Sequence, residues 1–515
     1  MTPARGGGGA ARRGALAALL LAACGCTVGP DYQRPSAPLS ANYKEGWKAG
    51  QPQDAIDRGA WWSIYKDPVL DRLERQIDIS NQNLKAAEAA FRASEAIVAE
   101  ARANFFPTAQ VNASAQRSRS STSGRGGGSA AFGGGGGGVN PISNLFSTDV
   151  TASWEPDLWG RIRRTVEADV ANAQASAGDL ASARLAAQAQ LASDYLQLRT
   201  ADELRRLLQD SVKAYSESLR ITQNQYQAGT TDQSAVSQAQ AQLASTRAQL
   251  IAVGNTRAQL EHAIAVLIGK PPAEFSIAPV TAVVAVPVIP AGVPSALLER
   301  RPDIATSERL VAAANAQIGV AVAAFYPNIT LSGDYGVSSS QLRKLFTAAS
   351  RVWSLGATGA ETIFDAGARR ALVRQNLAAY DETVANYRQT VLTALQQVED
   401  ELAALRILGQ QAEAEDAAVA AAREAERVIN NQYRAGTVAY TAVIVAETTA
   451  LADSEAALQI RQNRLTASVA LIQALGGGWN ASQLPSREQI ERDVPLDFNP
   501  LPPVVKTAPT SKPTP

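Results

Sequence analysis

The chain has 515 residues with 48 basic and 48 acidic side chains, and this zero net charge gives no support for a nucleic-acid-binding protein. Aromatic residues make up only 6% of the sequence and alanine dominates many stretches, which favours long, closely packed helices over an ordinary globular core. No cysteine follows Cys26, so disulfide bonds do not hold the rest of the chain together.

The first 23 residues predict a secretory signal peptide. Three arginines precede a short apolar run (15–23), which is too short to span a bilayer as a helix. The run ends in the motif LAAC at Cys24, which resembles a bacterial lipobox. That resemblance implies cleavage before a cysteine that then carries lipid, palmitate included. An acylated cysteine anchors a protein to a membrane, because each buried CH₂ contributes about 0.8 kcal/mol.

Two cysteines compete for lipidation. Leu21, three positions before Cys24, fits the lipobox better than Ala23 does before Cys26. The segment that starts at Cys26, however, aligns better with the mature N-termini of the family named below. We therefore expect lipid on Cys24, with Cys26 as the alternative. An ordinary signal peptide with an incidental cysteine is a third interpretation.

Long helices follow, in two copies. The segments 161–225 and 368–432 are rich in Ala, Leu, Gln and Arg and contain no proline, so each predicts a rod of roughly 100 Å. Shorter helices are expected over the ranges 70–104, 231–268, 303–324 and 438–475. Tight turns with a glycine, at 226–231 and 433–438, would join the helices into antiparallel hairpins. A soluble coiled-coil bundle would have the same helices.

The two copies form an internal repeat. The turn sequences YQAGT (226–230) and YRAGT (433–437) are 207 positions apart, and the same offset relates Gly269 to Gly476. Extra residues of the first copy fall in an interval with a glycine run (124–140), which cannot hold regular structure. The expected domains are a signal peptide (1–23), an N-terminal extended and equatorial segment (24–69), a first repeat (70–269), a proline-rich link (270–296), a second repeat (297–478), and a C-terminal equatorial segment with a disordered tail (479–515).

Four segments alternate between apolar and polar residues, which is typical of half-buried strands and of strands in outer-membrane barrels. The fourth is the weakest, because Glu361 is out of phase. Four strands cannot close a barrel and open edges are not tolerated in hydrocarbon, so several chains must combine theirs. The expected strands occupy approximately residues 108–116, 146–155, 328–338 and 353–363.

Orientation follows from this order of elements. Each strand pair lies between helices, so the helices all emerge on one side of the membrane. A lipid anchor at the start of the helical part would put that side in the periplasm, and the glycine-rich loop would face the exterior.

Several motifs together resemble an outer-membrane factor of the TolC type, in the lipoprotein branch that serves RND multidrug pumps. The resemblance implies a mixed α+β membrane protein: a homotrimer with a 12-stranded β-barrel, four strands per chain, continued by a long helical periplasmic barrel. The motifs are GPDYQRP (29–35), WWSIYKDPVLDRL (61–73), ARANFFPTAQVNASA (101–115), WEPDLWGRIRR (154–164), LLERRPDIATSERLVAAANAQIGVAVAAFYPNITLSG (297–333) and IFDAGARR (363–370).

The resemblance also implies a function: passive conduction of drugs or other small molecules from the periplasm to the exterior, as one part of a tripartite efflux pump. The implied partners are a periplasmic adaptor and an inner-membrane RND transporter, besides outer-membrane lipid, and no cofactor or metal is implied. The hairpin turns would form the periplasmic tip on which the adaptor docks. The implied tip residues are Tyr226, Gly229, Thr230, Asp232, Tyr433, Gly436 and Thr437.

One position in each tip departs from the family pattern. Relatives commonly carry an acid six residues after each tip glycine, where this chain has Ala235 and Ala442. An alanine ring would not attract cations and would gate by hydrophobic closure. The nearest acids are Asp232 and Glu447, and we expect weaker cation selectivity than in relatives with acids at both positions.

Other functions fit the sequence less well. An enzyme is not expected, because His262 stands alone among apolar residues and no metal, nucleophile or phosphate-loop motif is present. A periplasmic adaptor lipoprotein would have helical hairpins but not four alternating strands within a repeat. A structural envelope lipoprotein would have no use for a polar strand face.

Overall fold

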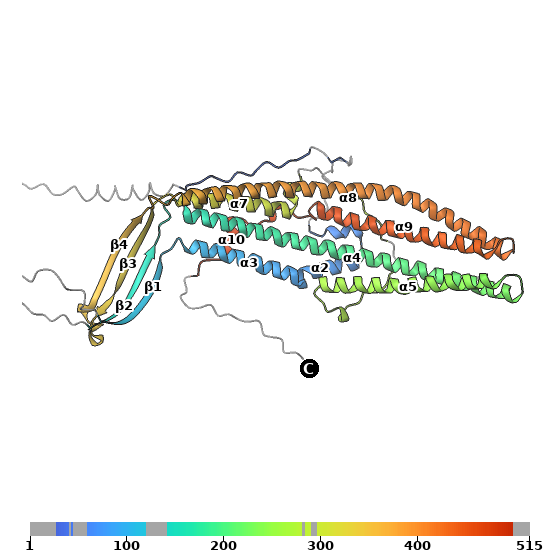
Figure 1. Ribbon diagram of the computed structural model, residues 1–515, viewed down its shortest axis with the longest axis horizontal. Coiled ribbons are helices and arrows are strands. Elements are labelled where there is room, and N and C mark those ends of the chain that lie inside the picture. The colour runs from blue at the N-terminus through green and yellow to red at the C-terminus, as the bar shows by residue number, and fades with distance from the viewer. Residues whose placement is uncertain are drawn as a thin grey trace, which may run out of the picture.

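The computed structural model describes residues 27–40, 43–44, 59–119, 142–280, 284–289 and 296–497. The signal peptide, Cys24, Cys26, the glycine run and most of the C-terminal tail lie outside these ranges. The described residues form an elongated molecule, with a small β-sheet at one end and long helices that reach to the other (Figure 1).

Helices of equal length occur in both halves of the chain. The longest have 67 residues each, the helices that follow them have 35 each, and the helices before the strands have 22 each. The α-helices are α2 (Pro68–Ser80), α3 (Gln82–Ala103), α4 (Arg161–Gln227), α5 (Gln233–Leu267), α6 (Leu297–Arg300), α7 (Pro302–Ala323), α8 (Ala368–Arg434), α9 (Tyr440–Ala474) and α10 (Arg487–Asp493). Short 3-10 turns are η1 (Trp61–Tyr65), η2 (Pro272–Glu274), η4 (Leu342–Lys344), η5 (Ala348–Ser350) and η6 (Ala481–Gln483).

The segment 70–104 is not the single helix expected from the sequence. It breaks at Asn81, whose extended backbone separates α2 from α3. The Asn81 side chain accepts a hydrogen bond from the backbone N–H of Leu84 (2.9 Å) and so caps α3. Its amide donates to the carbonyl of Leu267 (2.8 Å) at the end of α5. The break therefore joins α3 and α5 end to end beside the continuous α4.

The second half has a similar junction between α7 and α9. Arg301, which precedes α7, donates from Nη1 to the Ala474 carbonyl (2.9 Å) at the end of α9. Gly269 and Gly476 follow α5 and α9 with φ of 67° and 94°. A Cβ on Gly269 would collide with the backbone oxygen of Ser80, and one on Gly476 with that of Arg300, so both positions require glycine.

The strands form one antiparallel sheet in the order β1-β2-β3-β4. Their bounds are β1 (Thr108–Arg119), β2 (Ile142–Trp154), β3 (Asn328–Ser339) and β4 (Arg351–Ala360). The strand expected over 353–363 thus starts earlier and ends at Ala360. The reason is pairing, because Ala360 faces Asn328, the first residue of β3, and residues beyond it have no strand opposite.

The main core lies where α2, α4, α7, α8 and α9 meet, and it is built around Trp61, Tyr195 and Tyr387, each fully buried. Smaller apolar clusters continue along the hairpins toward the tips. Among the described helices, none is long and apolar enough to cross a membrane.

Candidate functional site

The sheet has two faces of different chemistry. The register aligns Val111, Val150, Tyr335 and Trp353 in one row across the four strands, and cross-strand partners share a face. All four side chains are exposed. Exposed rows of large apolar side chains are typical of surfaces that contact lipid or another protein.

The opposite face is polar and hydrogen-bonded between strands. Asn112 Nδ2 donates to Asp149 Oδ2 at 3.1 Å, and the hydroxyls of Ser114 and Ser147 are 2.8 Å apart. Ser354 donates to Asp334 at 2.7 Å. In the described sheet, the outer strands β1 and β4 each have one edge without a partner strand. The described sheet therefore has one polar face, one apolar face and two unpaired edges.

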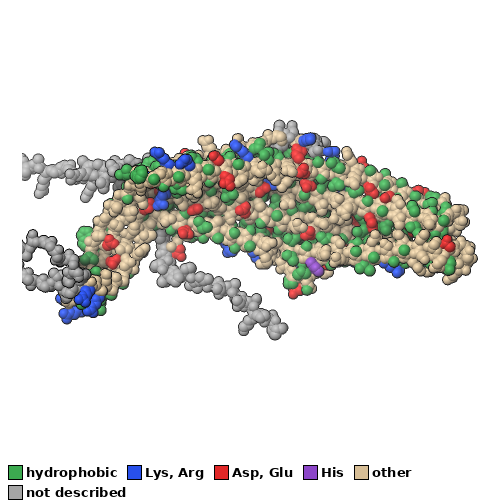
Figure 2. Space-filling model, in the orientation of Figure 1, with side chains coloured by type: hydrophobic (Ala, Val, Ile, Leu, Met, Phe, Trp, Pro, Cys, Tyr) green, Lys and Arg blue, Asp and Glu red, His purple; other side chains and the backbone are tan. Residues whose placement is uncertain are grey.

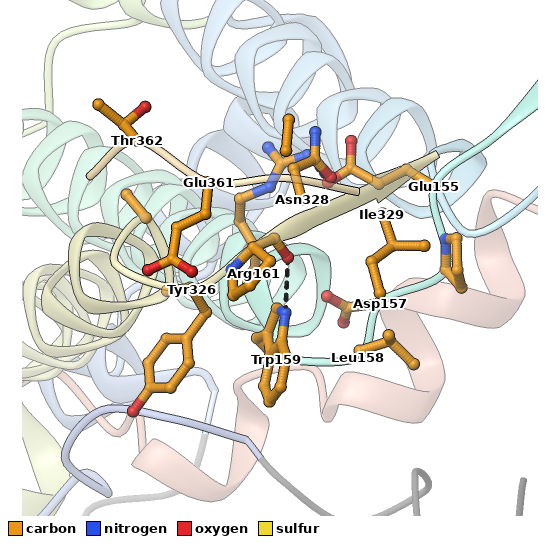
Figure 3. A pocket seen from close by; sticks show the side chains of 15 residues that line it. Glu155, Asp157, Leu158, Trp159, Arg161, Tyr326, Asn328, Ile329, Glu361 and Thr362 are labelled. Carbon is orange, nitrogen blue, oxygen red and sulfur yellow. Dashed lines mark hydrogen bonds and ion pairs between the residues drawn. The ribbon is translucent and has the colours of Figure 1, made fainter. Parts of the chain in front are cut away.

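The junction between sheet and helices is rigidly built (Figure 3). The Trp159 ring stacks on Tyr326 with centroids 5.0 Å apart, and its Nε1 donates to the Pro327 carbonyl at 2.8 Å. Asp157 accepts hydrogen bonds from the backbone N–H groups of Ile162 (3.0 Å) and Arg163 (2.9 Å), and so holds the first turn of α4. These contacts fix the direction in which the long helix leaves the sheet.

A cavity of about 240 Å³ lies at this junction, bounded by Trp159, Tyr326, Glu155 and Glu361. Arg161 pairs with Glu155 at 2.7 Å at its rim. In Figure 3 the labelled side chains come from the connection between β2 and α4, the first residue of α4, the approach to and start of β3, and the two residues that follow β4. The cavity is a gap between packed connections and contains no arrangement of nucleophile and base.

The two hairpin tips have the same backbone. Gly229 and Gly436 have φ of 70° and 74°, the left-handed region that glycine adopts at no steric cost. Thr230 donates its N–H to the Gln225 carbonyl at 2.9 Å, and Thr437 donates to the corresponding Gln432 carbonyl at 3.0 Å. Each threonine hydroxyl donates to the same carbonyl at 3.0 Å. The repeated turn sequence therefore encodes a helix C-cap followed by a reversal.

The tips differ in how the second helix begins. Asp232 is the N-cap of α5, where its Oδ1 accepts from the Ala235 N–H at 3.0 Å and from the Ser234 hydroxyl at 2.6 Å. Ala439 is the N-cap of α9 and offers no side-chain hydrogen bond. The predicted tip residues Gly229, Thr230, Asp232, Gly436 and Thr437 are all exposed.

The two tip tyrosines are in different surroundings. Tyr226 is 45% exposed, whereas Tyr433 is 6% exposed. The Tyr433 ring packs on Tyr440 with centroids 5.3 Å apart. Its hydroxyl lies 3.1 Å from the Thr222 hydroxyl and also donates to the side chain of Gln225, both on α4. Tyr433 thus links the second hairpin to the first.

The two candidate constriction alanines also differ. Ala235 is 6% exposed and packs in the cluster of Tyr433, Tyr440 and Val443 between the hairpins. Ala442 is half-buried. A role for either alanine in a constriction stays a prediction.

The sequence indicated only that Glu447 is the acidic residue nearest the second tip, whereas the structure shows that its side chain is buried. It is 4% exposed on α9, against α4, where Ser218 donates to its Oε1 at 3.3 Å. Its Oε2 is buried without a hydrogen-bond partner. Burial raises the pKa of Glu447 to about 7, and the nearby Glu426 carboxylate adds to the rise. The spacing of Tyr440, Val443, Glu447 and Ala450 along one helix face was the signal that could have shown its burial.

His262 is exposed on α5. Among the described residues, no group of three or more His, Cys, Asp and Glu side chains is arranged to hold a metal ion. The features with defined geometry are thus the two-faced sheet, its junction with the helices, and the paired hairpin tips.

The chain is similar to known proteins over most of its length. The family model for outer membrane efflux proteins matches residues 74–270 and 293–477. The pyoverdine export outer membrane protein OpmQ of Pseudomonas aeruginosa is 32% identical over 473 residues, which cover 91% of this chain and 96% of OpmQ. The probable efflux pump outer membrane protein TtgC of Pseudomonas putida is 29% identical over 477 residues, covering 92% and 96%. The solved outer-membrane channel OprN has a TM-score of 0.78 and 30% identity, and the match covers 88% of this chain and all of OprN.

Proposed function

Because the chain belongs to the outer membrane efflux protein family, we propose that it is the outer-membrane channel of a tripartite efflux pump, which conducts drugs or other small molecules passively from the periplasm to the exterior. Family members are channels rather than enzymes, and they work with an adaptor and an inner-membrane transporter. The observation that carries the proposal is the sheet with one apolar face, one polar face and two open edges.

Three copies would turn this sheet into a channel. Open sheet edges are not tolerated in the hydrocarbon core, so β1 of one copy must pair with β4 of the next. A ring of three four-stranded sheets gives a 12-stranded barrel with its apolar face toward lipid. The hydrogen-bonded face that carries Asn112 and Asp149 would line the lumen.

The helices would continue the barrel as a periplasmic tunnel, with the hairpin tips at its far end. Each half would supply one continuous helical rod (α4 or α8) and one rod made of two helices that meet end to end. The surface that an adaptor hairpin would meet consists of the exposed tip residues Gly229, Thr230, Asp232, Gly436 and Thr437. The link at 270–296 and the segments 24–69 and 479–515 would form an equatorial girdle around the tunnel.

Lipid on Cys24, or on Cys26 as the alternative, would hold the start of the helical part at the membrane from the periplasmic side. This orientation puts the connections between β1 and β2 and between β3 and β4 outside the cell. Mass spectrometry of the N-terminal peptide of the mature protein would identify the acylated cysteine.

The native mass of the detergent-extracted mature protein is the decisive measurement, followed by conductance in planar bilayers. We expect three chains per particle and stepwise conductance. A monomer that stays soluble after removal of lipid would contradict the channel and support a periplasmic adaptor or a structural envelope lipoprotein instead.

The closed tip would discriminate weakly between ions, because Ala235 and Ala442 stand where relatives have acids. We expect reversal potentials in a salt gradient to show only slight cation preference. Strong cation selectivity that disappears in the Asp232→Ala variant would contradict an apolar constriction and assign the filter to Asp232.

A further inference from the structure

The end of the sheet that lies away from the helices carries an uncompensated group of positive charges. Figure 2 shows Lys and Arg side chains gathered there, at the tip of the sheet. The chain has no acidic residue between Glu100 and Asp149, nor between Asp334 and Glu361. We refer to the exposed cations of this end as the outer basic patch: Arg117, Arg119, Arg343, Lys344 and Arg351.

The register decides which face these arginines occupy. Arg117 and Arg119 lie on the same face of β1 as Val111, because side chains alternate along a strand. Arg351, which pairs with Val337, lies on the same face of β4 as Trp353. All three arginines therefore lie on the apolar face of the sheet. The polar face at the same level is occupied by Ser118, whose hydroxyl lies 2.8 Å from that of Ser143.

We propose that the outer basic patch binds the phosphate groups of anionic lipids in the outer leaflet of the membrane. This inference rests on the proposed function, which sets the apolar face against lipid. An arginine on that face costs about 2–4 kcal/mol at the bilayer midplane but about 0–1 kcal/mol near the interface, so the end of the strands is where arginine is tolerated. The guanidinium fork binds phosphate through two parallel hydrogen bonds.

Apolar side chains beside the patch match the rest of such a lipid. Phe346 is 81% exposed and Leu342 is 63% exposed, both in the connection that carries Arg343 and Lys344. Trp353 lies two residues after Arg351 on the same face, as aromatic residues do at membrane interfaces. Exposed cations beside exposed apolar side chains fit a phosphorylated lipid better than a free anion.

In the proposed trimer the patch would be assembled between copies. Arg117 and Arg119 lie on one edge strand of the sheet and Arg351 lies on the other. When β1 of one copy pairs with β4 of the next, these arginines become neighbours across the subunit boundary. A bound lipid phosphate would then also stabilise the contact between copies.

Native mass spectrometry of the detergent-extracted full-length protein tests the proposal, with lipid A carrying two phosphates, dephosphorylated lipid A and phosphatidylcholine as probes. We expect retention of the phosphorylated form alone, weakened by salt. The variant R117Q/R119Q/R351Q should lower retention about tenfold or more. The matched control R205Q/R206Q/R247Q, which removes three exposed arginines of the helical region, should bind like the parent.

Arginine-to-lysine changes at the same three positions should cause an intermediate loss, because charge remains but the fork is gone. Equal retention of phosphorylated and dephosphorylated lipid A by the parent protein would overturn the proposal, and this comparison needs no variant to fold. A changed reversal potential with unchanged lipid retention would place the arginines in the lumen and also overturn it. A conducting trimer without phosphate preference rejects this inference alone, whereas a nonconducting monomer rejects the proposed function.

Discussion

The two hairpin tips share a backbone but differ in their side chains. Gly229 and Gly436 have φ angles within a few degrees of each other, and the same hydrogen bonds close both turns. Yet Tyr226 faces outward while Tyr433, at the equivalent position, is buried against the other hairpin. The turn is a property of local sequence, whereas the role of each tip depends on what packs beside it.

Because of this difference, the position of the second tip depends on its contacts with the first hairpin. Tyr433, Tyr440 and Glu447 all place their side chains between the second hairpin and the first. The first hairpin has its own cap, Asp232, and an exposed tyrosine. The first hairpin contributes Ala235 and Ala239 to the same apolar cluster. We infer that the second tip moves only when its contacts with α4 break.

Replacing the buried tyrosine should have the largest effect. Tyr433→Ala removes an aromatic side chain from a packed cluster and should lower the local opening free energy at the start of α9 by about 3–5 kcal/mol. Amide hydrogen exchange of the first turns of α9 measures this loss. The matched variant Tyr226→Ala should change protection by less than about 0.5 kcal/mol. Equal losses in the two variants would mean that the tyrosines have equivalent roles.

The next effect depends on pH. The pKa of Glu447 is raised from 4.5 to about 7, so its contribution to stability is fully present below pH 4.5 and is lost as the pH rises through 7. The contact between the hairpins should weaken by roughly 2–3 kcal/mol across this window. Thermal unfolding and hydrogen exchange at pH 5 and pH 8 measure the slope.

Glu447→Gln should abolish this pH dependence, because glutamine resembles the protonated acid. Gln240 occupies the equivalent position of the first hairpin and is exposed. Gln240→Glu should therefore add no comparable slope. A slope that persists in Glu447→Gln would assign the titration to another group, with Glu426 as the first to test.

The glycine turns should respond alike, since they are the shared part of the tips. Gly229→Ala and Gly436→Ala each force a Cβ into the left-handed region and should cost about 1–2 kcal/mol of local stability. Gly254 lies within α5 with open space around its Cα, so Gly254→Ala should instead stabilise its helix by up to about 1 kcal/mol. A turn that tolerates alanine in one tip only would show that the two backbones are not equivalent.

The smallest effect is expected when an N-cap residue is introduced at the start of α9. Ala439→Asp supplies α9 with the N-cap that Asp232 gives α5, and should gain about 0.5–1 kcal/mol. Hydrogen bonds from the Ser234 hydroxyl and the Ala235 N–H lower the pKa of Asp232, so its stabilisation is lost as the pH falls through that lowered value. Amide hydrogen exchange at the start of α5 should become faster in Asp232→Ala. An unchanged rate would show that the Asp232 cap does not stabilise α5.

Periodicity predicted the long helices and the four strands, because each relies on a regular pattern of local residues. The strand pairs even extend beyond the expected ends, to Arg119 and Ile142, which face each other. The break at Asn81 was not predicted. Ser80 and Asn81 are residue types that favour an N-cap, but the break also depends on the end of α5, 186 residues away in the chain.

At the hairpin tips, only the turns were predictable from the sequence. The repeat of Gly229 and Gly436 indicates two equivalent tips, and only the packing of α9 on α4 distinguishes Tyr433 from Tyr226. Likewise, the charges of Arg117 and Arg351 are visible in the sequence, but their common face depends on the pairing register of four strands.

The equal lengths of corresponding helices restrict how this protein can evolve. A one-residue insertion in α4 would rotate every side chain that follows it in the helix by about 100°. It would also shift each of them by about 1.5 Å relative to the two helices that meet end to end beside α4. Such an insertion is harmful unless neighbouring helices acquire matching ones, so natural selection removes it. Heritable length variation is then confined to connections such as 120–141, where the first half is already longer than the second. In the proposed orientation, those are the segments that any agent approaching from outside the cell meets first.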